Sequence, residues 1–384
     1  MFVGAQFGSA GLSDLAVAQG TVLICGTALT FGTPQFVMRH GLDAAHAEYL
    51  GSAFRLLFLT TLGTAVVAGS AWAAVPMLSE TISATKMLAV GIGVFLYVFV
   101  RLFADYLRGQ GKSSSSVTGE FIVPGLAFMA LALSTRDFFG DDTIIIAFGL
   151  SWLPAFLLLG LQCGTRKLGK GTPGQILKAY PEIASLLTVQ LLNVAMWQSP
   201  SVLLFMYGAT DTDIAAFFAI QKLCALPLTF SSALASSFGY QFLVAIKAER
   251  RSVVRRTVLS AALINGAGSA VILLPVLVAP ATMLLLFGLH TPSAAALFGL
   301  QILAGALAAR QFLGLNELYL SMSGRGSQEA VSAIFAALTW VVITVLLLPP
   351  TVPGVCFALA CSYLVRSALS LGRTYRAIAS IREF

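Results

Sequence analysis

The chain of 384 residues is 58% hydrophobic and only 10% charged, whereas soluble domains carry about 25% charged residues. This apolar excess argues against a soluble protein and indicates that lipid surrounds most of the chain. The net charge of +7 does not indicate nucleic acid as a partner, because the basic residues lie in short loops without a basic domain or interleaved aromatic residues.

Apolar segments long enough to cross a bilayer fill almost the whole chain. We expect an all-α integral membrane protein with about eleven transmembrane helices. Pro227 and Pro275 are the expected kink points of the two longest segments, because proline removes a helical hydrogen bond. The predicted spans are 15–37, 52–77, 87–108, 117–134, 143–163, 183–206, 214–245, 257–287, 294–321, 329–348 and 353–372.

The distribution of Lys and Arg among the loops predicts the orientation. Loops 164–182 and 246–256 are rich in basic residues, whereas the intervening loop 207–213 has none. Because Lys and Arg accumulate in cytoplasmic loops, this alternation places the C-terminus in the cytoplasm and the N-terminus outside. No basic region precedes the first span, so we expect no signal peptide. An outside N-terminus suggests that one helix is missing before Met1.

Two pairs of glycine turns indicate an internal repeat. Residues 107–112 (LRGQGK) and 322–327 (MSGRGS) both follow a span at its cytoplasmic end, and we pair Gly109 with Gly324. Residues 7–10 and 207–210 form the second pair. Both pairs have the same topological sense, which predicts two parallel-repeat six-helix lobes. The N-terminal lobe covers 1–175, with five spans and a basic cytoplasmic linker. The C-terminal lobe covers 176–384, with six spans. The first helix of the N-terminal lobe is absent.

Three stretches carry a family resemblance. Residues 207–222 (YGATDTDIAAFFAIQK) combine a glycine turn, an acidic pair and a helix start of small and aromatic residues. Residues 279–288 run from a proline to a Phe-Gly helix end, and a glycine turn follows Leu107. These stretches resemble the polysaccharide flippases of the multidrug/oligosaccharidyl-lipid/polysaccharide exporter superfamily, and the likeness in topology covers nearly the whole chain. The chain departs from the family by lacking the first span and by carrying Gln198 where an acid is common.

The resemblance implies both a substrate and a location. The substrate is a polyprenyl-diphosphate-linked oligosaccharide, moved to the outer leaflet of the bacterial inner membrane for lipopolysaccharide or exopolysaccharide assembly. The implied mechanism is alternating access, with two lobes rocking about a central cavity. The expected partners are this lipid-linked oligosaccharide, membrane lipids and a coupling ion, H+ or Na+.

Charged and polar residues inside the spans are the candidate binding residues, because a charge there costs about 2.5–3.5 kcal/mol on insertion scales. Lys222 and Arg310 are candidates for holding the diphosphate, and an ion pair or another satisfied polar contact is the structural alternative. The polar side chains of one span either bind sugar hydroxyls or join helices. The complete candidate set is Lys222, Arg310, Gln221, Gln198, Asn193 and Gln190.

The other charges have structural interpretations. Arg101 and Asp105 are spaced i, i+4 and predict an ion pair on one helix face. Arg366 is expected to extend its side chain to the cytoplasmic interface. The basic 164–182 loop is expected to lie on anionic lipid.

No motif indicates catalysis or a cofactor. The sequence contains no P-loop, GxSxG or HExxH motif, and its five cysteines form no CxxC pair. We therefore expect neither an enzyme nor a metal site. A drug or small-cation exporter is the nearest alternative, although such a protein favours buried acids and we place only Asp105, Glu120 and Glu317 inside spans. A glycan ligase or polymerase would need a large outer loop. A truncated inactive remnant is the remaining alternative.

Overall fold

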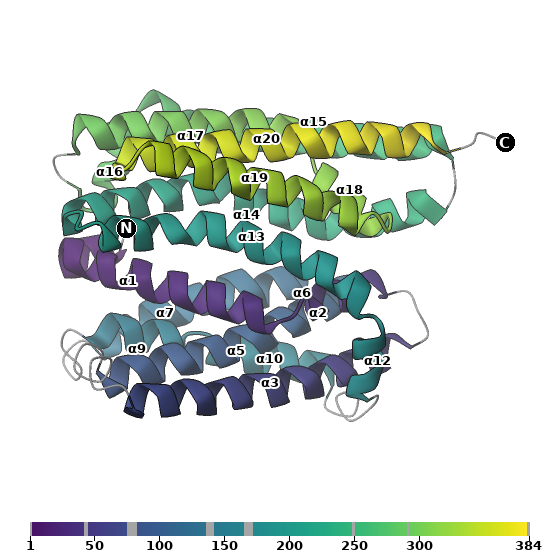
Figure 1. The fold of residues 1–384 in the computed structure, drawn as a ribbon, viewed down its shortest axis with the longest axis horizontal. Helices are drawn as coiled ribbons and strands as arrows, with labels where there is room; N and C mark the ends of the chain where they lie inside the picture. The colour runs from purple at the N-terminus through teal and green to yellow at the C-terminus, as the bar shows by residue number, and fades with distance from the viewer. Residues whose placement is uncertain are drawn as a thin grey trace. The chain divides into compact units, whose positions relative to one another are not determined.

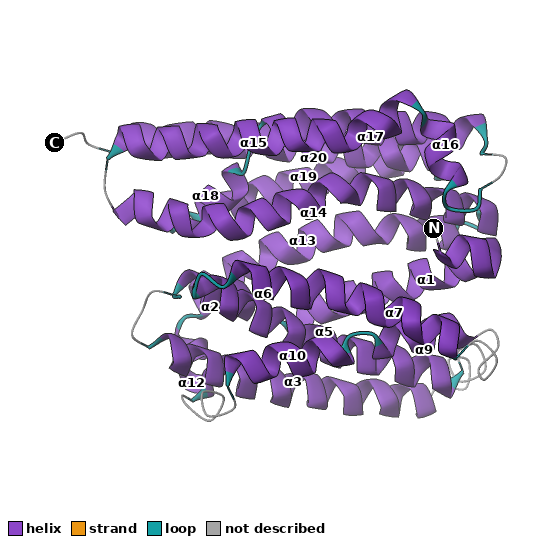
Figure 2. Ribbon diagram, turned by 180° about the vertical axis from the view of Figure 1, so that it is seen from behind, coloured by secondary structure: helices purple, strands orange, loops and turns teal. Residues whose placement is uncertain are grey.

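The computed structural model describes residues 2–41, 45–74, 83–135, 142–164, 172–247, 250–289 and 292–381. These residues are almost entirely helical and contain no strand (Figure 2). Within them, ten helices are long and apolar enough to cross a membrane. The predicted all-α membrane fold is therefore confirmed. The expected eleventh span, 183–206, corresponds to α13 (Tyr180–Met206), a helix of 27 residues whose polar side chains lower its hydropathy.

The chain divides into two compact units, each described here by itself. Val17–Leu191 form the N-terminal unit, and Met1–Ala16 together with Leu192–Phe384 form the C-terminal unit. The division lies within α1 (Phe2–Leu29) and α13, whereas the sequence suggested a boundary at the linker near residue 175. The arrangement as two parallel six-helix lobes stays a prediction.

The N-terminal unit is built around α5 (Ala84–Gly109), against which α2 (Thr33–Arg39), α9 (Thr143–Leu150) and α10 (Leu153–Cys163) pack (Figure 1). Its core includes Phe99, Phe103 and Tyr106 of α5. The remaining elements are α3 (His46–Ala74), α6 (Ser113–Val117), η1 (Thr118–Ile122), α7 (Val123–Ser134) and α12 (Pro173–Lys178).

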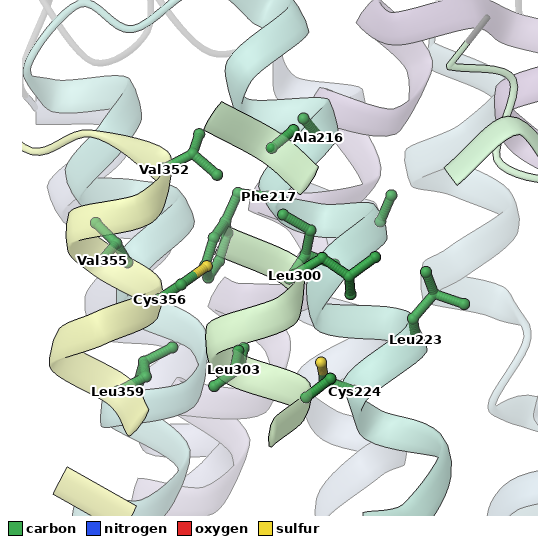
Figure 3. Close-up of a cluster of buried hydrophobic side chains, with 14 of the residues drawn as sticks. Ala216, Phe217, Leu223, Cys224, Leu300, Leu303, Val352, Val355, Cys356 and Leu359 are labelled. Carbon is green, nitrogen blue, oxygen red and sulfur yellow. The ribbon is translucent and has the colours of Figure 1, made fainter. Parts of the chain in front are cut away.

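The C-terminal unit is a bundle of long helices. The most extensive packing is of α20 (Val352–Ala379) against α17 (Ala294–Phe312) and α19 (Gly326–Leu346). Figure 3 shows the core, where Phe217 of α14 (Asp211–Lys247), Leu300 of α17 and Cys356 of α20 are all buried. The other helices are α15 (Arg251–Val278), α16 (Pro280–Leu285) and α18 (Asn316–Met322).

Side-chain caps fix where several helices begin. The hydroxyls of Ser83, Ser293 and Thr351 accept hydrogen bonds from backbone N–H groups three residues later, at 3.2–3.3 Å. Each bond satisfies a donor that has no partner inside the helix. Pro227 and Pro275 both lie inside continuous helices, α14 and α15.

Left-handed glycines correct the register of the repeat. Gly111 (φ 78°) and Gly324 (φ 77°) follow the ends of α5 and α18, whereas Gly109 is the last residue of α5. In both turns the residue after the glycine donates its N–H to the carbonyl five residues earlier, Lys112 to Leu107 and Arg325 to Leu320, at 2.9 Å. Glycine adopts this conformation without strain. If the predicted repeat holds, Gly111 rather than Gly109 corresponds to Gly324 in backbone conformation.

Several predicted spans are interrupted, two of them at residues with positive φ. The predicted 15–37 helix ends at Leu29, because Phe31 (φ 49°) and Gly32 (φ 71°) turn the backbone before α2. The candidate span in this region is Ala10–Leu29, which places Asp14 inside it. The predicted 294–321 helix breaks between α17 and α18, where Gly314 has φ 87°.

Part of the predicted interfacial linker forms α12 and the start of α13. Ile176 is buried in the N-terminal core, while Leu177 and Tyr180 are exposed. Residues 165–171 of the linker lie outside the described residues. Contact with anionic lipid and the cytoplasmic position of the C-terminus remain predictions.

Candidate functional site

Arg366 is the centre of a buried charged network in the C-terminal unit. Its side chain is 1% exposed, and its Nη2 lies 2.9 Å from Glu329 Oε1 and 3.0 Å from Glu317 Oε2. Arg366 Nη1 also donates to Asn193 Oδ1 at 2.8 Å. Glu329 accepts a further hydrogen bond from Ser370 at 2.7 Å. The prediction that Arg366 extends to the interface was wrong, because these partners satisfy its charge inside the bundle.

Arg310 is the second arginine of this network. Its Nη2 lies 3.0 Å from Glu317 Oε1, so Glu317 uses one oxygen for each arginine. The guanidinium carbon of Arg310 also lies 4.5 Å from the centre of the Tyr363 ring, a cation–π geometry. The structural alternative considered for Arg310, an ion pair, is therefore present.

An aromatic contact connects this network to α14. The ring of Trp197 lies 5.8 Å from that of Tyr363, and the Trp197 carbonyl accepts a hydrogen bond from the buried Gln221 side chain. Lys222 follows directly on α14, with its Nζ 4.7 Å from the Phe218 ring centre. A continuous series of contacts thus runs from α14 through α13 to α20.

The break between α17 and α18 positions both partners of one ion pair. Arg310 lies in the last turn of α17, and Glu317 lies in the first turn of α18. Gly314, between them, packs so closely on α15 that a Cβ at this position would lie 2.7 Å from Ala262 Cβ. A glycine is required here both for the positive φ and for the close approach.

The N-terminal unit contains a second charged network. Arg101 and Asp105 form the predicted i, i+4 pair at 3.5 Å, and Arg108 contacts the other Asp105 oxygen at 2.5 Å. Glu120, in the π-helical η1, binds both arginines, one with each oxygen. Each acid is thus shared by two arginines, and the prediction of a structural pair at Arg101 is confirmed.

The structure connects most, but not all, of the predicted site residues. Asn193, Gln221 and Arg310 belong to the contacts described above. Gln198 is buried next to Trp197 in α13, with 5% of its surface exposed. Gln190 belongs to the N-terminal unit. Their roles in binding stay predictions.

Sequence reasoning missed Glu329, which is fully buried. The predicted span 329–348 begins at this residue, and a carboxylate at the start of a span gives no sign that it is buried. Arg366 lies in the middle of its own span and offered a signal, because a charge at membrane depth needs a partner.

The electrostatics of the two networks are alike. Each combines two arginines with two carboxylates, and arginine suits buried pairs because its planar fork binds both oxygens of an acid. Among the described residues, no group of three or more His, Cys, Asp or Glu side chains could hold a metal ion.

No protein-family model matches the sequence, and no curated protein does either. Several solved structures are similar across nearly the whole chain. One is a MOP superfamily transporter from Pyrococcus furiosus whose binding pocket is described as having reverse polarity (TM-score 0.74, 15% identity, covering 100% of this chain and 91% of that chain).

Two others are a multidrug resistance MATE family transporter of the MOP superfamily in two conformations. The outward-facing conformation has TM-score 0.75 and 15% identity, and it covers 100% of this chain and 91% of that one. The inward-facing conformation has TM-score 0.70 and 15% identity, with coverage of 97% and 91%. This multi-pass membrane protein therefore has the fold of the MOP-superfamily transporters.

Proposed function

We propose that this protein is a transporter of the bacterial inner membrane that moves a polyprenyl-diphosphate-linked oligosaccharide to the outer leaflet by alternating access. The fold shared with MOP-superfamily transporters supports transport as the activity. The stretches 207–222 and 279–288, which resemble polysaccharide flippases, support the substrate class.

The observation that supports an anionic substrate is that arginines bind all four carboxylates of the two networks. Asp105 and Glu120 each contact both Arg101 and Arg108, Glu317 contacts both Arg310 and Arg366, and Glu329 contacts Arg366. A cationic substrate needs a carboxylate that it can approach. Because these carboxylates are already neutralised, they favour an anionic substrate over a cationic drug.

Lys222 is the proposed first contact for the diphosphate. It is half-buried within a candidate span, and an ammonium group binds phosphate oxygens as a point charge. Arg310 is the proposed second contact. Glu317 binds Arg310 and Arg366 with different oxygens, so Arg310 can exchange Glu317 for phosphate while Glu317 keeps Arg366. This exchange avoids leaving a buried carboxylate unpaired, which would be costly.

The amide residues have two different proposed roles, which follow from their contacts. Asn193 holds Arg366 and Gln221 holds the Trp197 carbonyl, so both join helices. Gln190 and Gln198 remain proposed ligands for sugar hydroxyls.

A drug exporter is the second candidate, and Asp14 is the observation that favours it. Asp14 is half-buried and lies one turn inside the Ala10–Leu29 span. Other acids of the described residues either belong to one of the two networks or lie no deeper than the first turn of a candidate span. A cation exporter would depend on this carboxylate, whereas a flippase for an anionic lipid would depend on Lys222.

The test is mass spectrometry of lipid extracts from a strain that lacks this gene. We expect a polyprenyl-diphosphate glycan to accumulate, and the full chain to relieve the accumulation. A chain carrying both Lys222→Ala and Arg310→Ala should reach the membrane in normal amounts without relieving it. If surface glycan is unchanged and no lipid-linked glycan accumulates, the flippase proposal is wrong.

A further inference from the structure

Arginines gather where α15 begins, at the same end of the C-terminal unit at which α20 ends (Figure 1). Residues 236–260 carry five basic residues and one acid, Glu249. No ion pair joins the arginines of this segment to an acid of the described residues. The segment is therefore a positively charged surface, on which four arginines are exposed: Arg250, Arg251, Arg255 and Arg256.

Other arginines at this end of the unit have partners inside it. Arg325 Nη2 donates to Ser380 Oγ at 2.9 Å, and Arg373 Nη1 donates to a hydroxyl of α19 at 2.7 Å. No comparable hydrogen bond is found for Arg251 or Arg255 within the part of the chain that the structure describes. These two are spaced i, i+4 on α15, where like charges repel each other. A bound anion would relieve this repulsion.

The length of α15 places its arginines at the level of lipid headgroups. Residues 257–278 carry no charge and span about 33 Å at about 1.5 Å per residue, close to the roughly 30 Å of the hydrocarbon core. Arg255 and Arg256 directly precede this segment, so they lie at the boundary between hydrocarbon and headgroups. Tyr375, exposed near the end of α20, agrees with this level, because tyrosine is enriched at membrane–water interfaces.

An exposed apolar stripe continues from the arginines along α15. Arg255 is followed at four-residue steps by Leu259 and Leu263, which are 56% and 58% exposed. Residues at i and i+4 lie on the same face of a helix. Val254 is fully buried and faces the bundle, so the exposed stripe points away from it. The stripe therefore has the order of a phospholipid, a charged end followed by an apolar part.

We propose that the start of α15 binds the headgroup phosphate of an anionic phospholipid, with Arg251 and Arg255 as its ligands and an acyl chain along Leu259 and Leu263. Arginine binds phosphate oxygens through charge-assisted hydrogen bonds, often two at once. A zwitterionic headgroup carries a cation of its own, which the arginines repel. The predicted orientation agrees with this partner, because the cytoplasmic leaflet carries anionic lipids. The inference does not depend on the proposed substrate.

Native mass spectrometry of the purified full chain in detergent tests the site, with phosphatidylglycerol or phosphatidylcholine added in increasing amounts. The wild-type protein should bind its first phosphatidylglycerol more tightly than its first phosphatidylcholine. Arg255→Gln should weaken phosphatidylglycerol binding by about fivefold, the factor that corresponds to one arginine near an anionic membrane surface. Arg251→Gln combined with Arg255→Gln should weaken it by about twentyfold. Neither change should affect phosphatidylcholine binding.

Lys112→Gln is the matched control. Lys112 is an exposed base directly before a helix of the N-terminal unit, but the four residues that follow it are serines and offer no apolar stripe. This variant should bind phosphatidylglycerol as the wild type does. All variants should unfold at the wild-type temperature when no lipid is added, because the substituted side chains are exposed.

Equal binding of the two lipids by the wild type would overturn the site, and so would a loss in Lys112→Gln as large as that in Arg255→Gln. Unchanged phosphatidylglycerol binding in the double variant would also overturn it and would favour an acidic protein as the partner of this surface. These outcomes leave the flippase proposal untouched, because no lipid-linked glycan takes part in the experiment.

Discussion

Each unit pairs two arginines with two carboxylates, but the paired residues are spaced differently along the chain. In the N-terminal unit, Arg101, Asp105 and Arg108 lie on α5, and Glu120 follows in η1. In the C-terminal unit, four separate helices supply Arg310, Glu317, Glu329 and Arg366. The first network is local in sequence, whereas the second exists only after the bundle has formed. The C-terminal network therefore depends on the tertiary structure and should be the more sensitive to substitution.

Removal of Arg366 should have the largest effect. Arg366→Met leaves the fully buried Glu329 without its arginine, and losing one partner of a buried pair costs about 3–5 kcal/mol. The measurement is the free energy of unfolding in mixed detergent micelles. The double variant Arg366→Met with Glu329→Gln should recover part of the loss, because the uncompensated charge is gone. Equal stability of the single and double variants would contradict the account.

Glycine substitutions extend the comparison to the backbone. Gly314→Ala should destabilise the protein by about 2–4 kcal/mol, because it combines a positive φ with the approach of Ala262. Gly111→Ala has a similar φ but no atom within 4 Å of the new Cβ, and should cost about 1 kcal/mol. Thermal unfolding of both variants separates packing from backbone strain. The ranking fails if Gly111→Ala is the more damaging.

Arg101→Met should cost less than Arg366→Met, about 1 kcal/mol. Its side chain is 26% exposed, and both Asp105 and Glu120 keep Arg108 as a partner. The same micelle titration compares the two arginines directly. A loss as large as that of Arg366→Met would mean that the N-terminal network has no spare arginine.

Tyr363→Phe should have the smallest effect, within about 0.5 kcal/mol, because the ring under Arg310 is kept. Tyr363→Leu removes the ring and should lose about 1 kcal/mol of cation–π stabilisation. A difference between the two variants in thermal unfolding assigns the effect to the ring. Equal losses would assign it to the hydroxyl.

Local sequence patterns predicted most of the fold and, of the charged contacts, the pair within one helix. Long apolar runs located the helices, and the i, i+4 spacing located the Arg101–Asp105 pair. The break at Gly314 was not predicted, because one glycine in a sequence does not reveal its φ. The Glu329–Arg366 pair was also not predicted. Its members lie on different helices, and no spacing rule connects them before the bundle is known.

The central claim is that the neutralised carboxylates suit the protein to an anionic substrate, with Lys222 as the binding cation. The most direct test reconstitutes the purified chain in liposomes and measures translocation of a polyprenyl-diphosphate glycan beside that of a cationic dye. We expect glycan translocation that Lys222→Gln abolishes and Asp14→Asn preserves, with no transport of the dye. Dye transport that requires Asp14 and tolerates Lys222→Gln would contradict the claim and favour the drug exporter.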